Sequence, residues 1–368
     1  IAIDNGFQSC ILAPTEILAN QHFKSLSELL IDYDVKVDLL TGSSKTRERN
    51  LIHSNLLSGK TNILVGTHAI LEDVVKFKNL GLSIIDEQHR FGVAQRAKLW
   101  KKNNPAPHIL VMTATPIPRT LAMSLYGDLD ISYIKELPPG RITTKTVHKY
   151  DRNRLSVFKF LKDQINKGRQ VYLVYPLINE SEKLDYKDLM DGYESIVREF
   201  PRPDFQVSIV HGKMKAKDKD YEMKRFINKE TQILVSTTVI EVGVNVPNAS
   251  VMVIESAERF GLSQLHQLRG RVGRGNDESY CILMTKDKLS EDSKLRIETM
   301  VKVSDGFKLA EVDLKLRGPG DMLGTRQSGM LKFKLADIIY DTEILNNARG
   351  SAIKVLKNDP RLSKNENL

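Results

Sequence analysis

The feature that most constrains the fold is a repeated alternation of short apolar runs with amphipathic stretches of helical length. The apolar runs extend from SCILA at Ser9–Ala13 to SYCILM at Ser279–Met284 and are rich in Val, Ile and Leu. Runs of strand length separated by helical segments predict parallel sheets that are covered by helices on both faces. The predicted fold class is therefore α/β.

The alternation is interrupted at KELPPGRITTK, Lys135–Lys145, where two prolines and a glycine disfavour regular structure. We place a domain boundary there, which predicts parallel-sheet lobes at residues 1–140 and 141–286. A charged helix at about Ser290–Asp305, the loop LRGPGDMLGTRQSG and more helix to about Leu356 follow, so residues 287–368 form a mainly helical third part. A length of 368 residues suits two domains and an appendage. No internal repeat is evident beyond the alternation itself.

Composition narrows the partners without deciding the activity. The formal net charge of +9 and the pI near 9.2 favour a polyanion such as nucleic acid, although a mildly basic enzyme would look the same. The apolar share of 41% is that of a folded, water-soluble protein, and no window approaches the ~18 apolar residues of a membrane span. Cys10 and Cys281 lie inside apolar runs, so we expect small core residues of a reducing, cytoplasmic protein.

The stretch LSIIDEQHRFG places two carboxylates, Asp86 and Glu87, directly after an apolar strand. Parallel sheets bind ligands at the carboxyl ends of their strands, where one carboxylate can hold Mg²⁺ and the next can orient a water. A lone acid pair at a strand end is more often simply solvated. Here MTATPIPR follows the next strand and APTEILANQH opens with a Pro-Thr helix start, while STTVIEVGVNVPNA and QLRGRVGRG stand in the second lobe.

Taken in order, these motifs resemble those of the superfamily 2 helicases and translocases, and among them the bacterial RecG branch-migration helicases. APTEILANQH resembles motif Ia, VGTHAIL the neighbouring strand-contact motif, DEQH motif II, TATPIPRTLA motif III, STTVIEVGVNVPNA motif V and QLHQLRGRVGRG motif VI. DLKLRGPGDMLGTRQSG, Asp313–Gly329, resembles the translocation motif shared by RecG and the transcription-repair coupling factor. GTRQSG and DEQHRFGV match the RecG version better. The resemblance covers essentially the whole chain.

The resemblance implies two RecA-like lobes, a helical hairpin within Ser290–Leu314 and a translocation loop. It also implies ATP and Mg²⁺ as cofactors, with Asp86 as the metal ligand and Glu87 positioning the attacking water. Planar guanidinium groups suit the charge that develops during phosphoryl transfer. The implied catalytic residues are Asp86, Glu87, Gln88, His89, Arg271 and Arg274, the last two as arginine fingers; the alternative for these two is a solvated arginine face.

Two further sets follow from the same motifs. Residues implied to couple the two lobes are Thr113, Thr115, Glu241, Gly243 and Gln267. Residues implied to contact DNA are Thr15, Glu16, Thr67, His68, Thr237, Thr238, Arg317, Arg326 and Gln327. Hydroxyls, amides and cations of this kind position phosphates without reading bases. The residues after Pro14 could instead be only a helix cap, and the glycine-rich loop only a surface connection.

The expected activity is that of a monomeric, ATP-dependent helicase that translocates on double-stranded DNA and remodels stalled forks and branched junctions. The alternatives are the translocase module of a transcription-repair coupling factor and a non-catalytic DNA-binding fragment. A phosphate-binding loop, G-x-x-x-x-G-K-[ST], is absent from the sequence. The nearest match is SGKTN, Ser58–Asn62, but the glycine expected five positions before Gly59 is Ser54, and a strand is predicted where a helix should follow. IAIDNGFQ looks like the last turn of a helix closed by Asn5-Gly6. We therefore expect a motor fragment, without this loop and the wedge domain, that hydrolyses ATP poorly or not at all.

Overall fold

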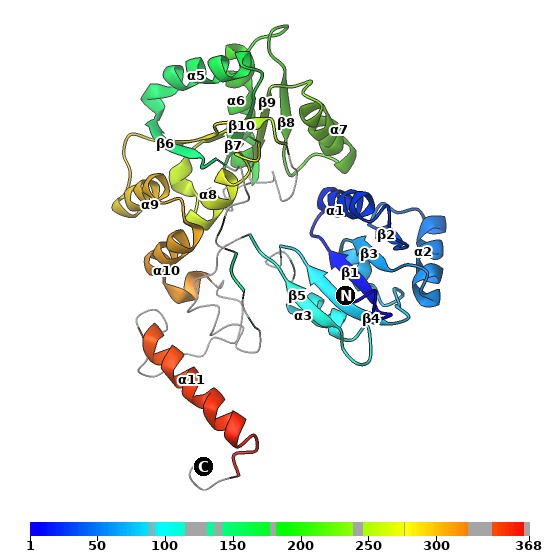
Figure 1. Ribbon diagram of the computed structural model, residues 1–368. Coiled ribbons are helices and arrows are strands. Elements are labelled where there is room, and N and C mark those ends of the chain that lie inside the picture. Colours follow the sequence, from blue (N-terminus) through cyan, green and yellow to red (C-terminus); the bar gives the residue numbers. More distant parts are fainter. Residues whose placement is uncertain are drawn as a thin grey trace. The chain divides into compact units, whose positions relative to one another are not determined.

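The computed structural model describes residues 1–87, 91, 93–114, 130, 132–134, 136, 142–176, 182–237, 246–275, 277–322 and 341–363. Within these residues the chain divides into two compact units, the first formed mainly by Ile1–Ala114 and the second lying within Thr115–Leu368. Each unit is a sheet with helices packed on it (Figure 1). The predicted pair of α/β lobes is confirmed. None of the described helices is long and apolar enough to cross a membrane.

The first unit contains a five-stranded sheet with the order β2-β3-β1-β4-β5, in which the strands pair in parallel. Each strand coincides with one of the apolar runs of the sequence. The elements are β1 (Gln8–Leu12), α1 (Glu16–Leu29), β2 (Val37–Leu40), α2 (Thr46–Ser58), β3 (Ile63–Gly66), the 3-10 helix η1 (His68–Leu71), β4 (Leu80–Ile85), α3 (Val93–Trp100) and β5 (His108–Val111).

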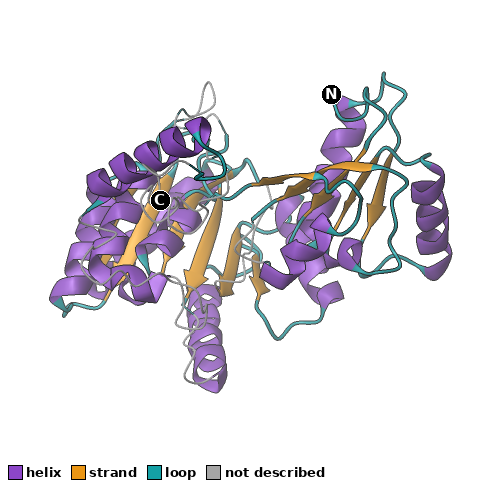
Figure 2. Cartoon of the chain, turned by 90° about the horizontal axis from the view of Figure 1, so that it is seen from below, coloured by secondary structure: helices purple, strands orange, loops and turns teal. Residues whose placement is uncertain are grey.

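Both faces of this sheet are buried, as the continuous apolar runs predict. Leu64 packs on one face with Ile52 and Leu56 of α2, and its neighbour Val65 packs on the other with Leu18 of α1. Because successive strand residues point to opposite faces, one apolar run supplies two separate cores. Helices lie beside both groups of strands in Figure 2.

The second unit contains a six-stranded sheet with the order β6-β11-β10-β7-β9-β8. Its elements are β6 (Lys145–Tyr150), η3 (Asp151–Asn153), α5 (Arg154–Asn166), β7 (Gln170–Tyr175), α6 (Glu182–Glu199), β8 (Val207–Val210), α7 (Ala216–Ile227), β9 (Ile233–Thr237), β10 (Ala249–Ile254), η4 (Ala257–Arg259), α8 (Leu262–Arg269) and β11 (Tyr280–Thr285). Sequence analysis missed β6, because KTVHKY is an edge strand that alternates exposed and half-buried residues and contains no apolar run. Cys10 and Cys281 are unpaired and fully buried, which confirms them as core residues.

The last part of the described chain is helical: α9 (Glu291–Lys302), α10 (Gly306–Met322) and α11 (Thr342–Asn358). Helix α9 confirms the charged helix predicted after Ser290, whose hydroxyl caps it. The predicted loop LRGPGDMLGTRQSG, Leu316–Gly329, is wrong over its first part, since α10 continues to Met322. The buried side chains of Leu309 and Leu314 anchor the first part of α10, and this packing offsets the cost of about 3 kcal/mol of a proline in the helix interior. The rest of the predicted loop, residues 323–329, and the first part of the helix predicted after it, residues 330–340, lie outside the described residues.

The boundary predicted at residues 140 and 141 falls in a segment, 137–141, that the structure does not describe. The division into residues 1–140, 141–286 and 287–368 therefore remains a prediction.

The two sheets share a local repeat that sequence analysis did not find. The pattern G-x-Q-x₅-P occurs at Gly6–Pro14 and at Gly168–Pro176, and T-x-I-L-V-x-T occurs at Thr61–Thr67 and at Thr231–Thr237. In each copy the glutamine begins the strand at the middle of the sheet, and the second pattern covers the strand beside it. The repeat is short and lies within runs of common residues, which is why its spacing becomes visible only when the strands are aligned.

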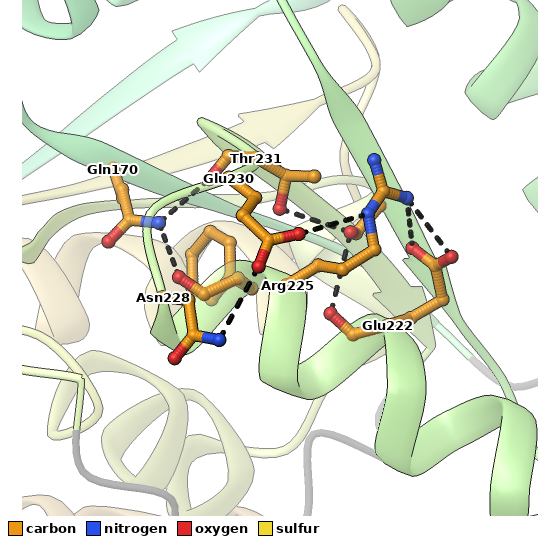
Figure 3. Close-up of polar contacts among 8 residues, drawn as sticks. Gln170, Glu222, Arg225, Asn228, Glu230 and Thr231 are labelled. Atoms are coloured by element: carbon orange, nitrogen blue, oxygen red, sulfur yellow. Dashed lines mark hydrogen bonds and ion pairs between the residues drawn. The ribbon is translucent and has the colours of Figure 1, made fainter.

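The repeated glutamines make the same contacts. Gln8 donates both amide hydrogens to carbonyl oxygens, at 3.0 Å to Leu56 and 2.7 Å to Thr61. Gln170 does the same at 2.7 Å to both Phe226 and Thr231 (Figure 3). Each buried amide thus satisfies carbonyls at the end of the preceding helix and at the start of the next strand.

Ion pairs secure the turn after α7. Arg225 donates to both carboxylate oxygens of Glu222 at 3.1 Å and lies 3.8 Å from a carboxylate oxygen of Glu230. Asn228 also donates to Glu230, at 3.4 Å (Figure 3). These contacts are partly exposed, so each adds only about 0–1 kcal/mol.

Four helical turns end in a left-handed residue, and three of these residues are glycine. The φ angles are 78° at Gly6, 81° at Gly59, 79° at Gly168 and 63° at Lys229. In each case the residue after the left-handed one donates its N–H to the carbonyl five positions earlier, a hydrogen bond typical of helix ends. These bonds are Phe7 N–H to Ala2 O, Lys60 N–H to Asn55 O, Arg169 N–H to Gln164 O and Glu230 N–H to Arg225 O. The first case confirms the predicted helical turn at Asn5-Gly6. The second confirms that SGKTN is a helix end followed by a strand.

Lys229 pays a steric cost that the three glycines avoid, because a Cβ at positive φ costs about 1 kcal/mol. We expect Lys229→Gly to raise the free energy of unfolding by about 0.5–1 kcal/mol in urea denaturation. The control is Lys167→Gly, at an exposed helix end with a φ of −82°. There glycine gains nothing sterically, so the same substitution should lower stability. Equal effects of the two substitutions would contradict the steric explanation.

Candidate functional site

The predicted site residues of the first unit stand on loops at one edge of its sheet. Thr15 follows β1, Thr67 follows β3 and Asp86 follows β4, and these strands are neighbours. Backbone hydrogen bonds continue the sheet into this edge, from Asp86 N–H to Leu12 O at 2.9 Å and from Ala13 N–H to Gly66 O at 2.8 Å. The edge is therefore rigidly built up to the residues of interest.

Both oxygens of the Asp86 carboxylate are engaged. Oδ1 accepts the Glu87 N–H at 2.9 Å, and Oδ2 lies 2.9 Å from Nε2 of His22 on α1. Glu87 is buried, with 7% exposure, and has a φ of 50°. Its Oε2 lies 3.4 Å from the N–H of Ala114, the residue after Thr113. A non-glycine residue held in the left-handed region beside a carboxylate is the kind of strain that functional sites retain.

The carboxylate of Asp86 fits a hard divalent cation. Its side chain is 20% exposed and offers oxygen ligands, while one oxygen keeps its geometry through the adjacent backbone amide. Among the residues that the structure describes, no three His, Cys, Asp or Glu side chains gather as a metal site. Mg²⁺ commonly takes only one or two carboxylates and completes its shell with water and phosphate oxygens, so the residues present suit Mg²⁺.

Two threonine hydroxyls stand at equivalent places in the repeat without a hydrogen-bond partner. Thr67 and Thr237 are the last residues of the T-x-I-L-V-x-T patterns, at the carboxyl ends of β3 and β9. Their exposures are 2% and 3%, and among the described residues Oγ1 of each lacks a hydrogen-bond partner. A buried hydroxyl left unpaired costs about 1–3 kcal/mol, which a ligand that accepts its proton would recover.

Thr15 and Glu16 make structural contacts. The Thr15 hydroxyl caps α1 by accepting the Leu18 N–H at 3.3 Å. Thr15 is therefore a helix cap, which was the alternative to a DNA contact. Glu16 accepts the N–H and the hydroxyl of Ser43, both at 2.9 Å. Within the same unit His68 is exposed at the start of η1.

Sequence analysis missed the loop TGSSK, Thr41–Lys45, which the structure joins to this edge. Glu16 holds it from one side, and Arg49 donates to Thr41 O at 2.9 Å and to Glu72 at 3.1 Å from the other. The loops after β1, β2 and β3 are thereby connected. The sequence feature that could have indicated this loop is its run of hydroxyl residues, glycine and lysine directly after an apolar strand.

In the second unit, Arg271 and Arg274 lie in a turn after α8 whose shape depends on glycines. Gly273 has a φ of 76°, and a Cβ there would lie 2.8 Å from Ser279 Oγ. A Cβ on Gly275 would lie 2.8 Å from Pro247 O. Burial raises the pKa of the Tyr172 phenol, and the positive charges of Arg274 and Arg271 act in the opposite direction. Both guanidinium groups therefore lie in the neighbourhood of this one side chain.

Arg269 is a second feature that sequence analysis missed. The residue is 6% exposed, and its guanidinium donates to the carbonyls of Met300, Val303 and Ser304 at 2.9–3.0 Å. It also donates to Nδ1 of His266 at 3.0 Å. The carbonyls belong to the end of α9 and the turn into α10, where the helix dipole favours a cation. Arg269 thus fixes α8 to these two helices.

His266 should make stability depend on pH. Burial, and to a lesser degree the charge of Arg269, lower its pKa from 6.5 to about 4. The unfolded chain therefore binds a proton below pH 6.5 that the folded chain refuses until about pH 4. The contribution of His266 to the free energy of unfolding is therefore complete above pH 6.5. It is lost as the pH falls toward 4, by at most about 3 kcal/mol.

The test compares urea denaturation of the wild type and His266→Gln at pH 7 and pH 5. A glutamine can still accept the Arg269 hydrogen bond but does not titrate, so the variant should lose less stability between the two pH values. Other titrating groups are common to both proteins and cancel in the difference. An identical pH dependence would show that His266 is not the responsible group.

The remaining predicted residues are described only in part. Thr113 follows β5, and Gln267 is half-buried on α8. Arg317 lies in α10, but its side chain is outside the description. The predicted residues outside the described part are Gln88, His89, Thr115, Thr238, Glu241, Gly243, Arg326 and Gln327.

Three family models match successive parts of the chain. Residues 2–124 match a DEAD/DEAH box helicase, residues 156–276 a helicase conserved C-terminal domain, and residues 303–368 the model described as ATP-dependent DNA helicase RecG, domain 3, C-terminal. Together the matched segments include most of the motifs on which the sequence resemblance rests.

Curated relatives with the description ATP-dependent DNA helicase RecG align with nearly the whole chain. The protein from Synechocystis is 50% identical over 100% of this chain and 44% of its own length. The protein from Bacillus subtilis is 49% identical over 97% of this chain and 52% of its own length. The chain thus spans about half the length of the relatives it matches.

Solved structures show the same fold. A structure of RecG bound to a three-way DNA junction has a TM-score of 0.74 and 43% identity, and it covers 92% of this chain and 44% of that one. The DUF1998 helicase MrfA bound to DNA has a TM-score of 0.62 at 16% identity, covering 83% of this chain and 46% of that one. The second likeness concerns the fold alone.

Proposed function

Because the chain belongs to the RecG-type DNA helicases of superfamily 2, we propose that it is the motor region of an ATP-dependent helicase that remodels branched DNA. The single observation that carries this proposal is the match to RecG proteins over essentially the whole chain at about half identity. The solved relative bound to a three-way DNA junction supports branched DNA as the substrate. The match of residues 303–368 to a RecG model favours this activity over that of a transcription-repair translocase.

The proposed nucleotide chemistry rests on Asp86 and Glu87. Asp86 would hold Mg²⁺ through its partly exposed carboxylate, and Glu87, buried and held at positive φ, would orient the attacking water. When bound, Mg²⁺ neutralises charge on the β- and γ-phosphates of ATP. Arg271 and Arg274 would stabilise the charge that develops on the transferring phosphoryl group.

The proposed DNA contacts are phosphate contacts. Thr67 and Thr237 carry hydroxyl donors at the carboxyl edges of the two sheets, and phosphate oxygens are acceptors. Each hydroxyl is buried, so the proposed contact requires a local opening that exposes it. Their equivalent places in the repeat suggest that each lobe holds one stretch of DNA backbone in the same way. The basic composition would add an attraction that weakens with salt.

Replacing each unpaired hydroxyl with a methyl group separates binding from stability. We expect Thr67→Val and Thr237→Val each to weaken binding to a three-way DNA junction by about ten- to a hundredfold, because a hydrogen bond to a charged group contributes about 1.5–3 kcal/mol. Each variant should also be more stable than the wild type by about 1 kcal/mol, because an unpaired buried hydroxyl is removed. Fluorescence anisotropy at constant salt and urea denaturation measure the two quantities.

Thr146→Val is the matched control. Its Oγ1 is also buried without a partner, but it lies near the start of the edge strand β6, away from the carboxyl edge. This variant should gain stability and bind the junction like the wild type. Unchanged junction affinity in both Thr67→Val and Thr237→Val would contradict the proposed contacts.

ATP hydrolysis by this chain should be weak. No G-x-x-x-x-G-K-[ST] run occurs in its 368 residues, so the backbone amides and lysine that cradle phosphates in this class of motor are missing from it. We expect phosphate-release assays to show little turnover with or without junction DNA. Any residual turnover should disappear in Asp86→Asn. Strong DNA-stimulated hydrolysis would contradict this expectation.

A further inference from the structure

We propose that His22 is a positioning residue that holds the Asp86 carboxylate in the orientation required for a divalent cation. The inference rests on the proposed function, because it concerns the carboxylate assigned there to Mg²⁺. His22 lies at the end of the APTEILANQH motif, and sequence analysis assigned no role to it. It is separated from Asp86 by 64 positions in the chain and reaches it from α1.

The geometry leaves Asp86 little rotational freedom. Nε2 of His22 lies 2.9 Å from Oδ2, and the Glu87 N–H lies 2.9 Å from Oδ1. An ionised carboxylate only accepts hydrogen bonds, so the imidazole nitrogen is the donor. With one donor on each oxygen, the plane of the carboxylate is set by two separate elements of the fold. Each oxygen still retains a lone pair for a ligand or a bound water.

The surroundings of the pair suit a positioning role. The side chains of His22 and Asp86 are 29% and 20% exposed, so both are partly shielded while a path from solvent to the carboxylate remains. Partners that hold a ligating carboxylate fix its direction, and losing such a partner typically lowers metal affinity 10–100-fold. A merely structural pair would not produce an effect on metal binding.

The helix that carries His22 also begins at the proposed DNA edge. Thr15 caps α1 and Glu16 is its first residue. His22 follows six positions later, about 9 Å along the helix axis at 1.5 Å per residue. One rigid helix therefore joins the loops at the DNA edge to the carboxylate of the nucleotide site. His22 is the contact through which a displacement of α1 would reach Asp86.

The test uses Mn²⁺ alone as the probe for the cation site in this chain. Mn²⁺ should broaden the amide NMR signals of Asp86 and Glu87, and the titration gives its affinity. We expect Asp86→Asn to abolish the selective broadening and His22→Ala to lower the affinity about tenfold. His22→Gln should restore it to within about threefold of the wild type, since its side-chain amide also donates a hydrogen bond. His108→Ala, at an exposed histidine on the edge strand β5, should have no effect.

A spectroscopic measurement tests the contact independently of any metal. The imidazole nitrogen signals of His22 should move in Asp86→Asn, while those of His108 should remain in place. Thermal unfolding confirms that each variant is folded.

The outcomes separate the two proposals. Wild-type affinity for Mn²⁺ in a folded His22→Ala variant, with binding still abolished in Asp86→Asn, would overturn the role of His22 alone. Unmoved His22 signals in Asp86→Asn would do the same. Failure of Mn²⁺ to broaden Asp86 and Glu87 in the wild type would overturn the metal role of Asp86 and the inference that rests on it.

Discussion

A buried side-chain amide at the start of the middle strand organises each of the two sheets. Gln8 and Gln170 satisfy the carbonyls of the helix end and of the strand start beside them, so the amino-terminal edge of each sheet is closed by internal hydrogen bonds. Buried carbonyls need partners, and a single amide with two hydrogens supplies two of them. The opposite edge carries the polar groups of the candidate site. These include the carboxylate of Asp86, which keeps free lone pairs beside its two internal contacts, and the buried hydroxyls of Thr67 and Thr237.

The strands that sequence analysis found are those with an uninterrupted apolar run, because burial on both faces leaves a continuous hydrophobic signature. The edge strand β6 lacks that signature, since KTVHKY is exposed on alternate residues. The repeated G-x-Q-x₅-P pattern also escaped notice, because only the paired contacts of its glutamines give it meaning. Helix α10 exceeded its predicted length because packing of its first turns outweighs the local preferences of the glycines and the proline that follow.

The candidate site was predictable where one residue carries its own chemistry. Asp86 and Glu87 after an apolar strand, and Arg271 and Arg274 between glycines, stand out by type and position. His22, Ser43 and Arg269 do not, because their roles depend on partners distant in the sequence or on backbone carbonyls, which leave no mark on residue type. The sequence thus indicates candidate reacting groups more readily than the residues that would orient them.

The buried guanidinium of Arg269 limits how the second unit can change shape. Pulling α8 away from the end of α9 would strand a charged group without acceptors, and breaking a buried charged contact of this kind costs about 3–5 kcal/mol. Helix α8, the end of α9 and the start of α10 therefore travel as one rigid block, also linked by the Ser263 hydroxyl to Asp313 at 3.0 Å. Bending within the second unit is therefore favoured outside this block, where the contacts of Arg269 stay intact.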